Sequence, residues 1–346
     1  MLKSAFHFVL TVLFLLPGIA TSANSPQAIP GAVGDVLLNT AWTYFEDASE
    51  RPDGLDQAVP ETVNLPHSWN SFDATDAAPG YRRDASWYGK QLTFAEGASR
   101  FRHILYFEGA NMRAEVFVNG QHAGGHVGAY LGFEIEITDL LDLQRDNAIL
   151  VRVDNSVDRS LIPSQKADFV LFGGLTRDVH LQVRPAVHID SVRIDTPSVS
   201  ATEASVVSTV FIDGRKNEPG IYRVEVKALD AQGNAVASAG GEIMAGNTKS
   251  SHEFVLPNIV NPALWSPDSP NLYTMEVSLK DPSGDVLHAT SEAFGLRWYE
   301  FAGDGAFVLN GKPLLLRGTH RHEEHAGYGA AMPDELHIRD MEMIKE

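Results

Sequence analysis

The stretch that decides the fold is Phe307-Val-Leu-Asn-Gly-Lys-Pro-Leu-Leu-Leu-Arg-Gly-Thr-His-Arg-His-Glu-Glu-His325. Its Asn310-Gly311 pair is a two-residue turn signal, which predicts a hairpin leading into an apolar strand at residues 314–316. A cluster of Arg, His and Glu follows, and then an amphipathic pattern predicts a helix that begins near Met332. Polar residues at the carboxyl end of a buried strand, followed by a helix, are how one βα unit of a (β/α)8 barrel begins.

A complete barrel of this kind takes roughly 250 residues. Only 47 residues follow Tyr299 in this chain (346 − 299). Residues 298–346 are therefore expected to be the incomplete start of a barrel domain, and the chain to be the front portion of a larger protein.

The first residues are expected to be a signal peptide, residues 1–23, and not part of the fold. Lys3 supplies a positive charge, residues 5–16 are largely apolar, and Thr21-Ser22-Ala23 offers small residues for cleavage. The run is shorter than the roughly 20 apolar residues that a membrane-spanning helix takes. The alternative is a buried N-terminal helix, which is disfavoured because turn-rich sequence follows. The mature protein is predicted to be exported by a bacterium, to the periplasm or the medium.

Composition excludes several function classes. The chain has 346 residues, no cysteine and a formal net charge of −18, so thiol nucleophiles and Cys-ligated zinc are absent. Nucleic acid and anionic membrane surfaces are disfavoured as partners, because binding them depends on Lys and Arg. A neutral ligand such as a sugar is compatible with this charge.

Two regions of short alternating strands precede the barrel start and predict a mainly β fold. Residues 24–185 show strand patterns separated by turns such as Asn119-Gly120, and their spacing predicts a jelly-roll sandwich. Residues 186–297 alternate again and predict an immunoglobulin-like sandwich. The expected strands are 104–107, 114–118, 133–137, 148–153 and 179–183 in the first region, and 192–194, 205–212, 222–229 and 273–279 in the second.

Short motifs follow one another along the whole chain. They are Leu65-Pro-His-Ser-Trp69, Ser86-Trp-Tyr-Gly-Lys90, Phe107-Glu-Gly-Ala-Asn111, Val116-Phe-Val-Asn-Gly120, Gly173-Gly-Leu-Thr-Arg-Asp-Val-His-Leu181, Phe294-Gly-Leu-Arg297 and segment 310–325. In this order and spacing they resemble glycoside hydrolase family 2, particularly its β-galactosidases. The resemblance implies a jelly-roll sugar-binding domain, an immunoglobulin-like domain and a catalytic TIM barrel, in a glycosidase that cleaves terminal β-linked sugars in carbohydrate metabolism.

The resemblance also assigns two substrate-binding residues. The family places an Asp nine residues before the Arg of its Arg-Asp-Val element, and Asp168 stands nine before Arg177. A carboxylate there would accept charge-assisted hydrogen bonds from sugar hydroxyls. His322 matches the family's barrel histidine that hydrogen-bonds the sugar, at the carboxyl face where barrel sites lie. The alternatives are a solvated loop Asp and a His that bridges backbone groups beneath the site.

Two departures leave the sugar open. His320 stands where the family commonly has Asn, and Glu324 where another His is often found. A β-galactoside is the expected substrate, because Arg-Asp-Val follows Gly174 and the net acidity does not attract an acidic sugar. A β-glucuronidase or another family 2 specificity is the alternative.

Retaining hydrolysis needs two carboxyl groups about 5 Å apart. The resemblance puts both on later barrel strands, beyond Glu346, so no catalytic residue is assigned in this chain. Glu323 and Glu324 are adjacent and would point apart in an extended segment, so they cannot flank one glycosidic bond. The 346-residue chain alone is therefore expected to be inactive.

The run from His320 to His325 contains residue types that bind metals. Imidazole and carboxylate are zinc ligands, but the run is not His-Glu-x-x-His on a helix and a third well-placed ligand is not apparent, so no metal is assigned. No cofactor is certain; the resemblance leaves magnesium or sodium open, and a homo-oligomer as well.

A function of another class also stays open. The two sandwiches could form a non-catalytic carbohydrate-binding protein. The sequence pattern favours the enzyme, because the tail keeps the register of a barrel start and its amphipathic helix would otherwise leave one face uncovered.

Overall fold

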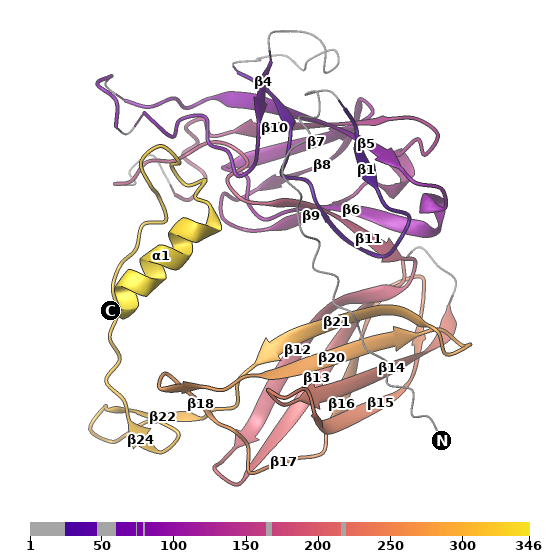
Figure 1. The fold of residues 1–346 in the computed structure, drawn as a ribbon, viewed down its shortest axis with the longest axis vertical. Helices are drawn as coiled ribbons and strands as arrows, with labels where there is room; N and C mark the ends of the chain where they lie inside the picture. The colour runs from indigo at the N-terminus through magenta and orange to yellow at the C-terminus, as the bar shows by residue number, and fades with distance from the viewer. Residues whose placement is uncertain (1–24, 47–59, 74, 79, 164–167, 216–218) are drawn as a thin grey trace, which may run out of the picture.

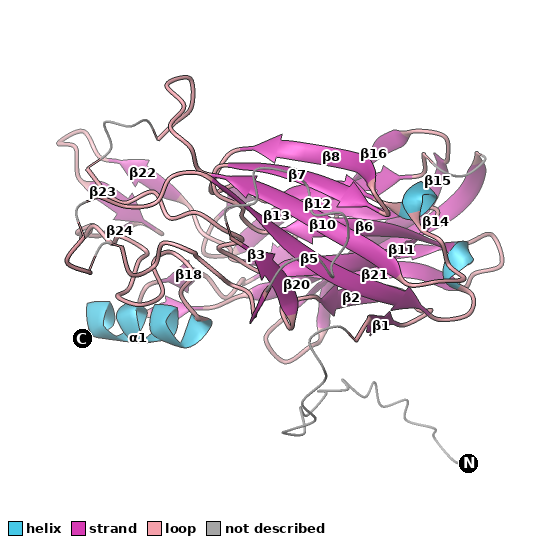
Figure 2. Ribbon diagram, turned by 90° about the horizontal axis from the view of Figure 1, so that it is seen from above, coloured by secondary structure: helices cyan, strands magenta, loops and turns pink. Residues whose placement is uncertain are grey.

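A computed structural model describes residues 25–46, 60–73, 75–78, 80–163, 168–215 and 219–346, and the expected signal peptide lies outside these ranges. The described chain is mainly β, as predicted: one sandwich lies above another, and a C-terminal segment with helix α1 (Asp334–Lys345) runs beside them (Figure 1). Seen from above, α1 lies at one end of the molecule (Figure 2). Within the described ranges, no helix is long and apolar enough to cross a membrane.

The first sandwich is built from two mostly antiparallel sheets. The larger has the strand order β4-β3-β5-β10-β7-β8, with β1 parallel to β5, and the smaller has the order β2-β11-β6-β9. The larger sheet contains β1 (Gln27–Ile29), β3 (Trp42–Phe45), β4 (Glu61–Val63), β5 (Ala85–Phe94), β7 (Arg113–Val118), β8 (Gln121–Val127) and β10 (Asn147–Asp154). The smaller contains β2 (Gly34–Leu37), β6 (Phe101–Phe107), β9 (Phe133–Glu136) and β11 (Val179–Pro185), and two 3-10 turns connect strands at Ala98–Arg100 and Thr138–Leu140.

Alternation along these strands explains the core between the two sheets. In β11, Val179, Leu181 and Val183 are fully buried while the residues between them are half-exposed. Trp42 and Tyr88 fill the opposite side of the same core. Side chains of a strand point alternately to the two faces, so a period-2 sequence buries one face only.

The second sandwich repeats this plan with a separate core. Its sheets have the orders β12-β13-β16, with β17 beside β13, and β15-β14-β20-β21. The strands are β12 (His188–Val199), β13 (Glu203–Asp213), β14 (Gly220–Leu229), β15 (Ala235–Ala245), β16 (Lys249–Val255), β17 (Ile259–Val260), β20 (Tyr273–Lys280) and β21 (Val286–Phe294). A two-stranded ribbon, β18 (Trp265–Ser266) and β19 (Ser269–Pro270), precedes β20.

A buried ion pair joins the two sandwiches. Arg102 of β6 contacts Asp213 of β13 at 3.1 Å and Glu136 of β9 at 2.8 Å. Arg215 adds a second contact to Asp213 at 2.8 Å. The junction is therefore made by charge pairing as well as by apolar packing.

The C-terminal segment begins with the predicted hairpin. β22 (Tyr299–Phe301), β23 (Phe307–Leu309) and β24 (Lys312–Pro313) form a three-stranded sheet. Asn310 and Gly311 have φ values of 51° and 76°, which is the left-handed pair that a two-residue hairpin turn requires. The helix α1 begins at Asp334, two residues after the expected start, because Pro333 is extended and precedes it as the cap residue.

The expected strand at residues 314–316 was wrong. Leu314 donates one backbone hydrogen bond to Phe307, but residues 314–324 lie outside any strand. Leu315 and Leu316 are 75% and 63% exposed. A barrel strand is held by hydrogen bonds to neighbours on both sides, and no described strand lies beside this segment.

Candidate functional site

Asp168 lies in the connection between β10 and β11, and it is exposed to solvent. Its neighbour Phe169 is half-buried and packs against a small cluster formed by Met112, Ala129 and Leu171. The backbone that carries Asp168 is therefore attached to the first sandwich by the apolar side chain of the next residue.

His322 lies in the segment that precedes α1, with 60% of its side chain exposed. Its imidazole ring meets the ring of Phe169 edge-on, with centroids 5.9 Å apart and an interplanar angle of 81°. Glu324 stands 3.9 Å from His322 Nδ1. The two residues predicted from sequence thus come from distant segments that meet at Phe169, and their roles stay predictions.

An exposed ion pair also bridges the two segments. Arg177, at the end of the first segment, pairs with Glu323 at 3.5 Å. Arg321 also contacts Glu323, at 3.3 Å, and joins this loop to α1 through Asp340 at 2.7 Å. Arg321 therefore braces the loop through the carboxylates of Glu323 and Asp340.

Tyr130 adds a half-exposed aromatic ring near the same loop. Burial raises the pKa of its hydroxyl, and the charge of Glu324 raises it further, while Arg177 opposes the shift. A neutral hydroxyl beside a carboxylate and a guanidinium is able both to donate and to accept hydrogen bonds. Sequence reasoning missed this residue, because a single Tyr after a Gly-rich strand has no pattern of its own.

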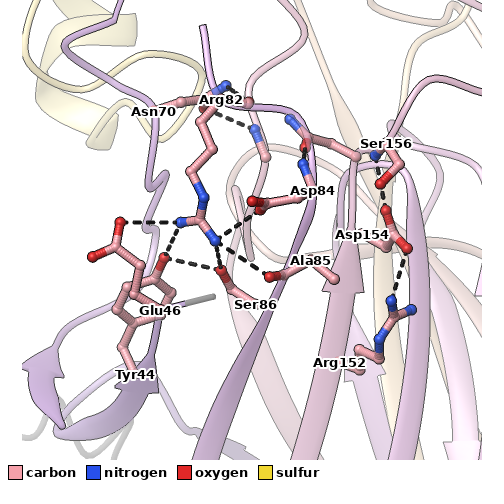
Figure 3. Close-up of polar contacts among 12 residues, drawn as sticks. Tyr44, Glu46, Asn70, Arg82, Asp84, Ala85, Ser86, Arg152, Asp154 and Ser156 are labelled. Carbon is pink, nitrogen blue, oxygen red and sulfur yellow. Dashed lines mark hydrogen bonds and ion pairs between the residues drawn. The ribbon is translucent and has the colours of Figure 1, made fainter. Parts of the chain in front are cut away.

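Sequence reasoning also missed a polar network that joins loop residues of the first sandwich to β3 and β5. Figure 3 shows Arg82 at its centre, with its guanidinium 2.9 Å from the Tyr44 hydroxyl and 2.8 Å from that of Ser86. Arg82 also pairs with Asp84 at 2.7 Å. Two buried amides, Asn70 and Asn155, continue this network towards the Asp168 segment.

His67, in the first motif of the sequence, is part of the structural support. Burial lowers the pKa of its imidazole to about 4, so the ring is neutral at pH 7. Its Nδ1 lies 2.8 Å from the Tyr88 hydroxyl, and its ring contacts Tyr44 edge-on. This histidine packs between aromatic residues and is not a candidate acid or base.

Two groups of three potential metal ligands occur in the described part of the chain. They are Glu108, Asp178 and His180, and His188, Asp190 and Asp213; the run from His320 to His325 belongs to neither. In the first group His180 already pairs with Glu108 at 3.2 Å, and Asp178 accepts a hydrogen bond from Asn39. Asp213 of the second group is occupied by two arginines.

Neither group fits magnesium or sodium well. Both ions prefer a shell made of oxygen atoms, whereas each group includes an imidazole, and the ligand atoms have protein partners. Magnesium, sodium and a homo-oligomer stay predictions of the family resemblance.

Comparison with known proteins identifies the family. Three profiles match in order: "Glycosyl hydrolases family 2, sugar binding domain" at residues 38–185, "Glycosyl hydrolases family 2" at 187–297, and "Glycosyl hydrolases family 2, TIM barrel domain" at 302–346. The chain belongs to glycosyl hydrolases family 2. The resemblance seen in the motifs is thereby confirmed, as is the fold class, with two β domains followed by part of a barrel.

Relatives within glycosyl hydrolases family 2 carry two kinds of name. A protein named putative beta-glucuronidase from Formosa agariphila is 48% identical, over 89% of this chain and 37% of its own length. A beta-galactosidase from Thermoanaerobacter pseudethanolicus is 31% identical, over 90% of this chain and 42% of its own length. The crystal structure of Bacteroides uniformis beta-glucuronidase superposes with a TM-score of 0.84 at 28% identity, covering 91% of this chain and 38% of that one. The chain spans less than half the length of each.

Proposed function

We propose that this chain is the amino-terminal part of a retaining, exo-acting β-glycosidase, in which Asp168 and His322 bind the terminal sugar. The observation that carries the proposal is that their two segments meet at Phe169, whose ring centroid lies 5.9 Å from that of His322. An exposed carboxylate and an exposed imidazole on one loop cluster suit a ligand rich in hydroxyl groups. The two catalytic carboxyl groups are proposed to lie outside these 346 residues.

The sugar is proposed to be a β-glucuronide or a β-galactoside. The relative at 48% identity, named putative beta-glucuronidase, supports the glucuronide. The β-galactoside expected from the motifs has the support of a relative at 31% identity. The higher identity gives the glucuronide the stronger support. Arg177, beside the site, would supply a cation for an acidic sugar.

A two-part assay tests the proposal. The complete reading frame that encodes this chain, and the 346-residue chain alone, are each incubated with 4-nitrophenyl β-D-glucuronide and β-D-galactoside. The complete product is expected to release nitrophenol from one of them and the chain alone from neither. Asp168→Asn should raise KM or lower kcat/KM by at least about tenfold, the scale of one charge-assisted hydrogen bond.

Either of two results would contradict the proposal. One is hydrolysis by the 346-residue chain alone. The other is a complete product whose kcat/KM is the same with Asp168→Asn and with His322→Ala as in the unchanged protein.

We further propose that residues 1–23 direct export of the protein and are then removed. The amino-terminal sequence of the protein recovered from the periplasm or the medium tests this, and a mature product that still begins at Met1 would argue against it.

A further inference from the structure

Two buried amide side chains hold the segment that follows Asp168 and Phe169. The carbonyl of Leu171 accepts hydrogen bonds from Asn155 Nδ2 at 2.9 Å and from Asn70 Nδ2 at 3.3 Å. Gly173 N donates to Asn70 Oδ1 at 2.9 Å. Both asparagines have no exposed surface. The backbone at 171–173 is thus bonded to Asn70, which comes from another loop, and to Asn155, at the start of the same connection.

The amides are themselves fixed from the other side. Asn155 Oδ1 accepts from Asp84 N at 3.0 Å, and Asn70 Nδ2 also donates to the Arg82 carbonyl at 3.2 Å. Arg82 is in turn held by its contacts to Tyr44 and Ser86 on β3 and β5 (Figure 3). Each amide therefore links the Asp168 segment to the rigid sheet.

This linkage matters because the connection itself has little regular structure. It runs from the end of β10 at Asp154 to the start of β11 at Val179, without strand or helix in its described residues. Loop backbone that lacks a ladder is positioned by the individual hydrogen bonds it makes. Backbone donors of Trp69 and Asn111 hold the carbonyls of Gly173 and Gly174, and the two amides hold the Leu171 carbonyl and the Gly173 N–H. Phe169 lies two residues before Leu171, and its ring is the one that meets His322.

We propose that Asn155 and Asn70 are positioning residues for the sugar site. They fix the backbone at 171–173, which sets Phe169 and, through its ring, the place of His322 relative to the segment that carries Asp168. The sugar-binding part of this inference rests on the proposed function; the positioning of His322 does not.

Asn147 provides a matched control for Asn155. It stands at the first residue of β10, whereas Asn155 follows the last, and it too has no exposed surface. Its side chain bonds Asp142, Arg145 and Asn119 in a similarly dense network. The two asparagines are separated by the length of β10, about 26 Å at roughly 3.3 Å per residue.

The experiment compares Asn155→Asp with Asn147→Asp in the 346-residue chain. An aspartate at 155 keeps an acceptor for Asp84 N but loses the donor to Leu171 and places a carboxylate against its carbonyl. The first measurement is the histidine Cε1–H NMR signal of His322, assigned with His322→Ala, because the Phe169 ring current acts on it. The second is affinity for methyl β-D-glucuronide and methyl β-D-galactoside by titration.

Asn155→Asp is expected to move the His322 signal and to lower the affinity for the sugar about tenfold. That is the scale of one buried hydrogen-bonding group left unsatisfied. Asn147→Asp is expected to lower the melting temperature about as much as Asn155→Asp does. It should leave both the His322 signal and the sugar affinity unchanged. Phe169→Leu, which keeps an apolar side chain without the ring, shows how far the signal moves when the ring contact is lost. Asn155→Ala, which removes the donor to Leu171 without placing a charge against its carbonyl, decides the matter if Asn155→Asp does not fold.

The inference is overturned if the His322 signal stays in place in Asn155→Asp or, where that variant does not fold, in Asn155→Ala. It is also overturned if Asn147→Asp moves the signal equally, because the effect would then be general destabilisation. If the unchanged chain binds neither sugar, the sugar-binding part fails together with the proposed function, and the NMR signal still decides the positioning.

Discussion

Arg102 in the first sandwich and Asp213 in the second form an ion pair of 3.1 Å whose side chains are only 3% and 2% exposed. Burial alone would raise the pKa of Asp213, but hydrogen bonds from Arg215 and Arg102 hold it well below its usual range. The carboxylate is thus charged inside the domain junction. A charge in such a place is stable only while its partners remain.

Removal of this guanidinium is predicted to destabilise the protein strongly. Arg102→Met leaves Asp213 and Glu136 without their shared partner, and the loss for a broken buried pair is about 3 kcal/mol in the free energy of unfolding. Urea unfolding followed by circular dichroism measures it. Arg215 still contacts Asp213, so the loss is expected to be lower than for a carboxylate left alone.

The control is Arg193→Met. Arg193 pairs with Asp195 at 2.9 Å, but their side chains are 60% and 48% exposed, and such surface pairs contribute less than about 1 kcal/mol. Equal effects of the two substitutions would show that the junction pair adds nothing beyond a surface pair.

Acid is predicted to destabilise the fold through buried histidines, of which His103 is the simplest. It is 1% exposed, and burial lowers the pKa of its imidazole to about 4 from its usual 6.5. Between these values the unfolded chain binds a proton that the folded chain does not. The contribution is therefore fully present above pH 6.5 and is lost as the pH falls towards 4, at about 1.4 kcal/mol per pH unit.

His103→Leu tests this sign. Urea unfolding is measured at pH 7.5, 5.5 and 4.5. The free energy of unfolding should fall less steeply with decreasing pH in the variant, by the contribution of one histidine. His188 and His288, whose pKa values burial also lowers to about 4, keep the remaining decline in place. An unchanged slope in His103→Leu would contradict the assignment.

Gly173 is predicted to tolerate no side chain. A Cβ at this position would overlap the ring of Trp69 and stand 2.8 Å from Asn155 Nδ2, so either the ring or the amide must move. Overpacking of this kind costs about 1–3 kcal/mol. Gly173→Ala should lower the melting temperature and weaken sugar binding together, because the displaced groups hold the Asp168 segment.

The paired control is Gly303→Ala. A Cβ at Gly303 meets nothing within 4 Å, so this variant should melt and bind as the unchanged chain does. Gly173→Ala with an unchanged melting temperature would mean that the loop shifts at no cost.

Much of the fold could be predicted because it depends on local signals. The hairpin at Asn310-Gly311 was predicted from two residues whose φ values the turn demands. The strand at 314–316 was not realised, because a parallel strand depends on neighbours that its own residues do not encode. The helix start was misplaced by two residues, as cap positions depend on backbone geometry around Pro333.

The candidate site likewise has residues that could be predicted from sequence and residues that could not. Family motifs gave Asp168 and His322, and the structure brings their segments together. The amides of Asn70 and Asn155 have no such signal, because a buried asparagine and a turn asparagine look alike in sequence. Only the hydrogen bonds to Leu171 distinguish them.

The last prediction concerns the apolar surface of the C-terminal segment. Ile338, Met341 and Ile344 of α1 are 58%, 49% and 51% exposed, and Leu315 is 75% exposed. Apolar side chains gathered on one segment favour association. The 346-residue chain is expected to associate more as its concentration rises, measured by light scattering after size exclusion. Leu315→Glu combined with Ile338→Glu is expected to reduce this association.

The control is Val260→Glu on the second sandwich, where Val260 is 71% exposed. Association that persists in the double variant but disappears in Val260→Glu would place the contact on the second sandwich instead.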